Sequence, residues 1–408
     1  MDGPAREKVM INLDPLLLPN LLVMLFVFIM IVIAVINTLA LRNLNDYKNP
    51  RSFPRISVLV PARNEEDKIY PCVKSLLAQD YPDFQVIVLD DNSTDLTGAI
   101  LKDFVRQDQR LRVIKGLPLP QDWLGKHWAC HQLYRAADGA LLMFTDADTV
   151  HTPDTLRCAA AALEGENADM LSIVPRHRLG SWAEKLVMPI FALSVFANVP
   201  LPRRLRPRDI KVLSSSGKLM LFRRRSYEKS GGFEAIKQNV LDDLQLPQEI
   251  TAAGMRYRLF DGTNNVSCRM YHNWKEVHEG LSKNTFAAFG YNSPLSVFTW
   301  LWITFVFWEP VIALGIRRMP DYPPLLSLGL AAISILASIL LFTVYYQRFK
   351  LPLYMVFFYP ASILLMTIIA FSSMYLTLSG QTTWKDRKLP DRKLLKNETA
   401  NTTNITKN

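Results

Sequence analysis

The stretch Leu141–Asp154, LLMFTDADTVHTPD, decides the fold that we expect for this chain. Its start, Ala140–Phe144, is a short apolar run typical of a strand buried in a parallel sheet. Asp146 and Asp148 follow at once. Residues i and i+2 of an extended backbone point to the same side, so both carboxylates are expected together at the strand's carboxyl end, where open α/β sheets bind ligands. A Mg²⁺-type ion would hold such a pair, and an acidic turn that caps the strand is the alternative.

Apolar runs that indicate strands alternate with segments of helical spacing through the middle of the chain. Strands are expected at Ile56–Pro61, Phe84–Leu89, Leu111–Ile114, Leu171–Val174, Leu213–Arg223 and Arg256–Phe260, and helices at Ile69–Ala78, Leu96–Arg106, Trp123–Ala137 and from Leu241 to Gly254. This alternation predicts βαβ units. The expected fold class is therefore α/β, a doubly wound and mostly parallel sheet, here flanked by transmembrane helices.

The 408-residue chain has a net charge of +10 and is 49% hydrophobic, but its apolar residues gather in a few runs. Leu16–Leu41 contains no charged residue, which predicts a retained membrane anchor. The expected organisation is an N-terminal tail at 1–15, the anchor at 16–41, one globular domain at 51–292, membrane segments at 295–316, 324–346 and 352–378, and a basic, partly disordered tail at 385–408. The segment 295–316 contains Glu309-Pro310, so an interfacial position is the alternative there.

Two further features indicate contact with a membrane rather than with nucleic acid. Ser181–Pro202 is strongly apolar, and we interpret it as an amphipathic segment in the membrane interface, with a core helix as the alternative. Basic clusters at Arg203–Arg208, Arg317-Arg318 and Lys385–Lys396 favour anionic lipid headgroups. The four cysteines are isolated from one another, which indicates neither a zinc site nor a disulfide framework and fits a reducing compartment.

Six motifs occur in a fixed order along the domain: PARNEE, DDNSTD, GK-x-x-A, TDAD, SGGF and LDDLQL. Together they resemble the family 2 glycosyltransferases, which have the GT-A nucleotide-sugar-binding fold, from Ile56 to about Asn284. The arrangement of apolar runs is similar to that of the lipid-glycosylating branch, which includes ceramide, hopanoid-type and carotenoid glycosyltransferases. WLGKHWA, RMY and the terminal TWK-x-R look most like the bacterial carotenoid-type proteins.

The resemblance implies that two turns hold a nucleotide, which we expect to be the UDP of a UDP-sugar. The residues implied are Pro61, Arg63, Glu65, Asp90 and Asp91. A carboxylate there can accept hydrogen bonds from a uracil N–H or a ribose hydroxyl. The alternative is that Ser93 and Asp95 merely cap the following helix.

The resemblance also implies how the diphosphate is held. Asp148, with Asp146, would bind a divalent cation, Mg²⁺ or Mn²⁺, that neutralises charge on the departing nucleoside diphosphate. Lys126 would lie against the diphosphate as a point charge, unless it is a solvated lysine on a helix face. Arg269 is expected near the diphosphate as well.

Asp243 is the implied catalytic base, because transfer with inversion needs a carboxylate that takes the proton of the acceptor hydroxyl. Asp242 stands where the family usually has Glu, and the alternative is that both carboxylates only complement a helix dipole. The Q-x-x-R-W motif of processive members is absent from the sequence. We therefore expect one sugar to be added to a membrane lipid; a polysaccharide synthase and a non-catalytic protein with a relic domain are the alternatives. Arg42, Lys48 and Arg51 predict that the domain faces the cytoplasm.

Overall fold

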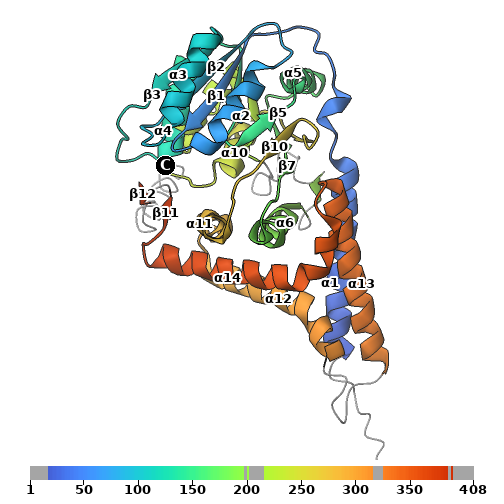
Figure 1. Cartoon of the computed structure of the whole chain (residues 1–408). Coiled ribbons are helices and arrows are strands. Elements are labelled where there is room, and N and C mark those ends of the chain that lie inside the picture. Colours follow the sequence, from blue (N-terminus) through green and yellow to red (C-terminus); the bar gives the residue numbers. More distant parts are fainter. Residues whose placement is uncertain (1–16, 197–199, 202–215, 316–324, 385–386, 389–408) are drawn as a thin grey trace, which may run out of the picture.

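The computed structural model describes residues 17–196, 200–201, 216–315, 325–384 and 387–388. The predicted N-terminal tail, the basic clusters at 203–208 and 317–318 and nearly all of the tail at 385–408 lie outside the described residues. Within the described part, a sheet domain rests on a layer of helices, and long apolar helices lie beneath and beside that layer (Figure 1).

A seven-stranded sheet forms the centre of the domain. In order across the sheet, its strands are β3 (Leu111–Lys115), β2 (Phe84–Asp90), β1 (Ile56–Ala62), β4 (Leu141–Phe144), β8 (Met220–Arg223), β6 (Met170–Val174) and β9 (Tyr257–Asp261). Neighbouring strands are parallel, except that β8 is antiparallel to both β4 and β6. The predicted fold class, a mostly parallel doubly wound sheet, is confirmed.

Side chains of β1 alternate between two hydrophobic cores, which shows why the sheet is covered on both faces. Val58 and Val60 lie in one core with α2 (Glu66–Leu77), α3 (Thr97–Gln107) and α5 (Thr155–Gly165). Leu59 lies in the other core with α4 (Gly125–Ala136) and α10 (Asp242–Ala252). Both sets are fully buried, as the continuous apolar run predicts for a central parallel strand. The short helices α8 (Arg224–Lys229) and α9 (Gly232–Ala235) complete the second face.

A second, three-stranded sheet lies beyond the carboxyl end of β4. It consists of β5 (Thr149–His151), β10 (Val266–Cys268) and β7 (Arg176–His177), with β10 in the middle. The sequence did not predict it, because its strands have only two or three residues. Because β5 begins directly after Asp148, the acidic turn connects the seven-stranded sheet to this smaller sheet. The predicted strand Leu213–Arg223 was also too long, as β8 begins at Met220 after a turn at 217–218.

Among the described residues, four helices are long and apolar enough to cross a membrane. They span Leu17–Ala40, Ser293–Gly315, Leu326–Arg348 and Leu353–Leu378, close to the four runs predicted. The first three correspond to α1, α12 (Ser293–Gly315) and α13 (Leu325–Arg348), and the last comprises η5 (Leu353–Phe358) and α14 (Tyr359–Leu378). In Figure 1, α1 lies along α13, and α14 runs beneath α6 (Trp182–Phe196) and α11 (Trp274–Thr285).

The apolar helices are joined to the sheet domain by buried polar contacts. Asp261, at the end of β9, is fully buried and forms an ion pair with Arg348 in the last turn of α13. The backbone N–H of Asp261 donates to the carbonyl of Arg42, 2.8 Å away, and Arg348 donates to the carbonyl of Leu41. These contacts bring the ends of α1 and α13 to one edge of the sheet. These contacts therefore fix the ends of α1 and α13 relative to the sheet domain.

Helix α6 covers most of the segment 181–202 for which we predicted an interfacial position. Val187, Met188 and Ile190 are buried, and the helix packs on α11 and α14, whereas Trp182 at its start is 57% exposed. The buried side chains favour the core-helix alternative and the exposed Trp182 does not, so the interfacial position stays a prediction. Residues 197–199 and 202 lie outside the described part, as do several side chains in the second half of α6.

We predict that Gly232→Ala destabilises the fold more than Gly254→Ala. Both glycines have positive φ, +51° at Gly232 and +77° at Gly254, so an alanine at either site carries a left-handed backbone penalty of about 1–2 kcal/mol. A Cβ at Gly232 would also collide with the Tyr227 ring, whereas a Cβ at Gly254 meets no heavy atom within 4 Å.

The collision with the Tyr227 ring adds an overpacking cost of about 1–3 kcal/mol at Gly232 alone. Chemical denaturation of the detergent-solubilised protein measures both losses, with Gly254→Ala as the matched control for backbone strain. Equal losses in the two variants would show that Tyr227 moves aside without cost.

Candidate active site

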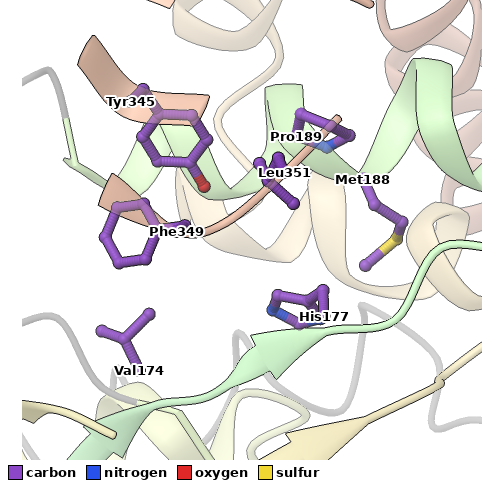
Figure 2. Close-up of a pocket in the computed structure, with 7 residues that line it drawn as sticks. All are labelled: Val174, His177, Met188, Pro189, Tyr345, Phe349 and Leu351. Carbon is purple, nitrogen blue, oxygen red and sulfur yellow. The ribbon is translucent and has the colours of Figure 1, made fainter. Parts of the chain in front are cut away.

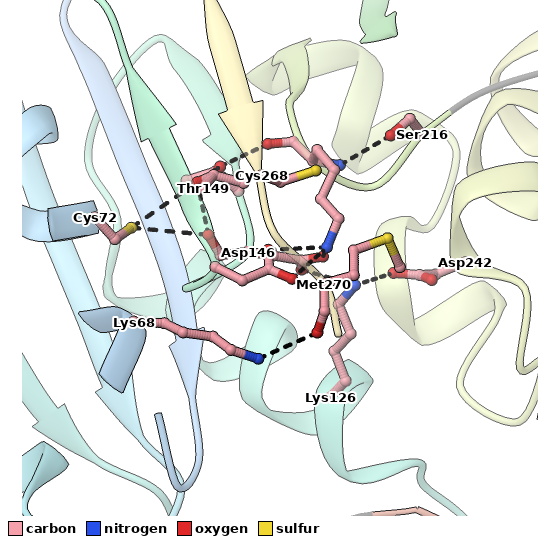
Figure 3. Close-up of polar contacts among 12 residues, drawn as sticks. Lys68, Cys72, Lys126, Asp146, Thr149, Ser216, Asp242, Cys268 and Met270 are labelled. Carbon is pink, nitrogen blue, oxygen red and sulfur yellow. Dashed lines mark hydrogen bonds and ion pairs between the residues drawn. The ribbon is translucent and has the colours of Figure 1, made fainter. Parts of the chain in front are cut away.

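A cluster of charges lies where β4 ends, and it contains both carboxylates of the TDAD motif. Lys218 and Asp242 in this cluster are buried, Asp146 and Asp148 are partly buried, and Lys126 lies at its exposed edge. Lys126, from the first turn of α4, lies 2.9 Å from Asp146 Oδ1 and 3.0 Å from Asp242 Oδ2 at the start of α10 (Figure 3). Lys218, in the turn before β8, donates to Asp146 Oδ2 at 3.0 Å. The Lys218 ammonium also donates to both oxygens of Asp148, at 2.9 and 2.8 Å. Asp146 is thus held between two ammonium groups.

The charges in this cluster set each other's protonation states. Burial alone would raise the pKa of Asp146, but Lys126 and Lys218 outweigh it and lower that pKa well below its usual range. Burial would likewise lower the pKa of both lysines, and the neighbouring carboxylates raise it well above the ordinary value instead. The pKa of Asp242 is lowered because Lys126 outweighs burial. These groups therefore remain charged at neutral pH.

Asp243 lies beside this cluster but has the opposite electrostatic behaviour. Burial raises the pKa of its carboxyl to about 7, and the negative charge of Asp242 adds to the increase. Gly217 lies next to both groups: a Cβ on it would be in ordinary van der Waals contact, 3.5 Å from Lys126 Nζ and 3.9 Å from Asp243 Cβ. One carboxyl poised near neutrality therefore lies next to a cluster of permanent charges.

The two turns predicted to hold the nucleotide lie side by side, at the ends of β1 and β2. Arg63 donates to the carbonyl of Asp91 at 2.8 Å, and the N–H of Asp91 donates to the carbonyl of Ala62 at the same distance. Asp90 accepts a hydrogen bond from the N–H of Ser93, 2.9 Å away. Pro61 lies opposite Leu89 in the β1–β2 pair, and Glu65 immediately precedes α2. The structure therefore brings all five predicted nucleotide residues to one edge of the sheet.

Asp95 of the DDNSTD turn caps a helix, as the alternative interpretation of this turn predicted. Asp95 accepts hydrogen bonds from the N–H groups of Thr97 and Glu66, at 3.0 and 3.1 Å, so it supports the starts of both α3 and α2. Ser93 accepts from the N–H of Asn64 at 3.0 Å and so joins the two turns. Since these bonds do not use the side chain of Asp91, capping leaves the predicted nucleotide role of Asp91 open.

Residues 57–231 match the family model described as glycosyl transferase family 2. The chain carries a family 2 glycosyltransferase domain. Together with the strand order, this match identifies the sheet domain as a GT-A fold, as predicted.

Curated relatives and solved structures similar to the chain include three glycosyltransferases. The probable glycosyltransferase YdaM of Bacillus subtilis is 26% identical over 223 residues, which are 54% of this chain and 52% of that protein. The 4,4'-diaponeurosporenoate glycosyltransferase of Staphylococcus aureus is 24% identical over 249 residues, 59% of this chain and 63% of its own. The chain thus spans between about half and two thirds of these relatives' lengths. The mannosyltransferase PcManGT of Pyrobaculum calidifontis, solved with GDP-Man and Mn²⁺, is 19% identical with a TM-score of 0.48, covering 81% of this chain and 88% of that one.

The residues of the family 2 domain fit a divalent cation of the Mg²⁺ or Mn²⁺ type. The Lys218 ammonium contacts the carboxylates of both Asp146 and Asp148. The position between these two carboxylates therefore suits a cation. Among the described residues, no group of three or more His, Cys, Asp or Glu side chains is placed to hold a metal ion. Two carboxylates are nevertheless enough for an ion that takes its other ligands from water and a diphosphate.

Arg269 pairs with a carboxylate of α6. Its guanidinium makes two hydrogen bonds to the carboxylate of Glu184 in α6, at 3.1 and 3.0 Å. Glu184 also accepts from the N–H groups of Gly180 and Ser181, so the arginine is fixed to the start of α6. The contact of Arg269 with the diphosphate therefore stays a prediction, and its observed partner is a carboxylate.

Sequence reasoning missed two lysines that the fold brings to the site. Lys218 lay inside a run that we interpreted as a strand, although the polar sequence Ser214–Gly217 before it was a signal for a turn. Lys283 comes from α11, far along the chain, and burial together with the charge of Lys126 lowers the pKa of its ammonium to about 8. No local pattern distinguishes Lys283 from a surface lysine. Only the packing of α11 under the sheet brings it near the cluster.

We predict that Asp243→Asn stabilises the protein more at pH 8 than at pH 5. The folded-state pKa of Asp243, about 7, lies above its ordinary value of 3.8, so the stability that the protonated carboxyl provides is lost as pH rises towards 7. Asparagine does not ionise, so the variant does not lose this stability as pH rises. One pH unit between the two pKa values corresponds to about 1.4 kcal/mol, so the gain should grow by roughly 1–3 kcal/mol from pH 5 to pH 8.

Unfolding of both proteins in denaturant at the two pH values measures this difference, and pH 5 serves as the internal control. An equal effect of Asp243→Asn at both pH values would mean that the pKa of Asp243 is not raised.

Proposed function

We propose that the protein is an inverting glycosyltransferase that moves one sugar from a UDP-sugar to a hydroxyl group of a membrane lipid. The observation that carries this proposal is the pairing of Asp243, a carboxyl with a pKa of about 7, with the charged cluster around Asp146 in a family 2 domain. A base that ionises near neutral pH accepts a proton well there. The charged cluster supports the binding of an anionic donor and its cation.

The described residues divide the chemistry between them. Asp146 and Asp148 would hold a divalent cation, which supplies Lewis-acid stabilisation of the departing diphosphate when bound. Lys126 places a second positive charge next to Asp146 and supports the same anion. Asp90 and Asp91, at the end of β2, are proposed to contact the uridine. The donor is thereby oriented with its anomeric carbon towards α10.

Asp243 acts as the base that takes the proton from the acceptor hydroxyl. Its oxygen lone pair accepts this proton while the acceptor oxygen bonds to the anomeric carbon and the bond to the diphosphate breaks. Asp242 assists by its charge, because it contributes to the raised pKa of Asp243. The acceptor must therefore approach from the side of α10.

The environment of the site supports a lipid as acceptor. An apolar pocket lies between the sheet domain and the membrane helices, lined by Val174, His177, Met188, Pro189, Tyr345, Phe349 and Leu351 (Figure 2). Burial lowers the pKa of His177 to about 4, so its ring is neutral and the pocket carries no charge at neutral pH. The S. aureus relative is named for a carotenoid acid. Such an acceptor has a long apolar chain, which fits the long apolar helices that flank the domain.

We further propose that the four candidate helices anchor the protein in a membrane with the domain on the cytoplasmic side, where nucleotide sugars are supplied. Arg42, Lys48 and Arg51 follow α1 and support this orientation. Anionic headgroups are the proposed partners of the basic clusters. Addition of a single sugar is supported by the absence of Q-x-x-R-W from the sequence, which disfavours the polysaccharide synthase. The intact acidic residues disfavour a relic domain.

The donor and product can be tested together. Membranes that contain the protein are incubated with a panel of radiolabelled UDP-sugars, and the extractable lipid is analysed by mass spectrometry. We expect one donor to label the lipid with one sugar per molecule, and membranes with the Asp243→Asn protein serve as the control. A ladder of sugar additions would favour the synthase, and no transfer from any nucleotide sugar would favour the relic domain.

We also predict that Asp243→Asn lowers the turnover number steeply. Asparagine keeps the size of the side chain but cannot accept a proton, and loss of a general base typically costs about 10²–10⁴-fold in rate. The dissociation constant of the UDP-sugar should stay nearly the same, because Asp243 is proposed to contact the acceptor rather than the nucleotide. Steady-state kinetics and calorimetry measure the two quantities. Near-normal turnover would exclude Asp243, and Asp242 would be tested next.

A further inference from the structure

The ammonium of Lys218 contacts both carboxylates that are proposed to hold the divalent cation. Its ammonium lies 2.8 and 2.9 Å from the two oxygens of Asp148 and 3.0 Å from Asp146. The residue is only 7% exposed, so water screens these contacts weakly. An ammonium and a divalent ion cannot share the same carboxylate oxygens, because both need the space and their charges repel.

We propose that Lys218 is an internal cation that competes with the divalent ion for Asp146 and Asp148. The inference rests on the proposed cation site and is independent of the sugar and acceptor. With Lys218 in place, the two carboxylates are neutralised without an ion. The ion binds only when the ammonium moves away from them.

The structure shows how the ammonium can move while the chain around it stays in place. The carbonyl of Lys218 accepts a hydrogen bond of 2.6 Å from the hydroxyl of Thr145, the residue just before Asp146. Its backbone is therefore tied to the acidic turn and continues directly into β8. The ammonium, in contrast, ends a flexible chain of four methylene groups, whose rotation carries it away from the carboxylates.

This competition has a consequence for how the site is filled. The ion binds weakly to the free protein, because it must first displace Lys218. A diphosphate offers oxygen ligands to the ion and a negative charge to the displaced ammonium. The ion and the nucleotide therefore favour each other's binding, as linkage requires.

Binding of Mn²⁺ alone to the full-length, detergent-solubilised protein tests the proposal by calorimetry. We expect Lys218→Gln to bind Mn²⁺ at least about tenfold more tightly than wild type, since the binding-competent state is a minor population while Lys218 competes. Lys68→Gln is the matched control, because it removes an equal charge from a different place. The ammonium of Lys68 donates to the carbonyl of Met270 (Figure 3). Its Mn²⁺ affinity should equal that of wild type.

Two further variants separate the possible failures. Asp148→Ala should abolish Mn²⁺ binding, and unchanged binding in it would reject the cation site itself. If Asp148→Ala loses binding but Lys218→Gln binds Mn²⁺ no more tightly than wild type, only the competition is rejected. Lys218→Arg keeps the charge and should keep the weak affinity of wild type.

The stability of Lys218→Gln gives a readout that does not depend on calorimetry. Without Lys218, two carboxylates repel each other, so Mn²⁺ should raise the melting temperature of this variant more than that of wild type. If the variant is unfolded without the ion, Mn²⁺ should restore a cooperative transition. A melting curve that Mn²⁺ leaves unchanged would contradict the proposal.

Discussion

The position of Asp146 between the ammonium groups of Lys126 and Lys218 is the interaction on which the rest of the site depends. Charges removed from water are tolerated only when they are paired, and removing one partner of a buried pair typically costs about 3–5 kcal/mol. Lys218 is buried and falls under this rule, whereas Lys126 is partly exposed and its pair is screened by water. Here the pairs connect α4, the turn after β4, the turn before β8 and the start of α10. The same ion pairs that satisfy the buried charges therefore also fix the positions of the elements around the site.

This cluster also explains why two neighbouring carboxyls, Asp242 and Asp243, have opposite electrostatic behaviour. Asp242 contacts Lys126 and remains ionised, whereas Asp243 experiences burial and the charge of Asp242, which together raise its pKa. Adjacent positions in the sequence thus supply one permanent charge and one group that titrates near neutral pH. Such a division of roles between two carboxyls is a general way to obtain an acid or a base at neutral pH.

The membrane helices contribute to the same structure rather than acting as separate anchors. The core that covers one face of the sheet continues through α6 and α11 to α12, α13 and α14 without a break. The ion pair of Asp261 with Arg348 adds a buried polar link at the edge of the sheet. The side of the site formed by α10 and α11 is therefore held at a defined place relative to the apolar helices, and this is the side from which we propose that the acceptor approaches.

Local sequence patterns were sufficient to predict the strands that end in polar clusters, the mostly parallel sheet, the candidate membrane helices and the grouping of Asp146 with Asp148. These features depend on local periodicity and on the rule that parallel strands present their carboxyl ends at one edge. Tertiary packing, by contrast, brings Lys218 and Lys283 to the site, pairs Arg269 with Glu184 and buries Val187, Met188 and Ile190 of α6. Each of these contacts joins residues far apart in the chain, so its existence depends on how the helices pack across the sheet and not on any local pattern.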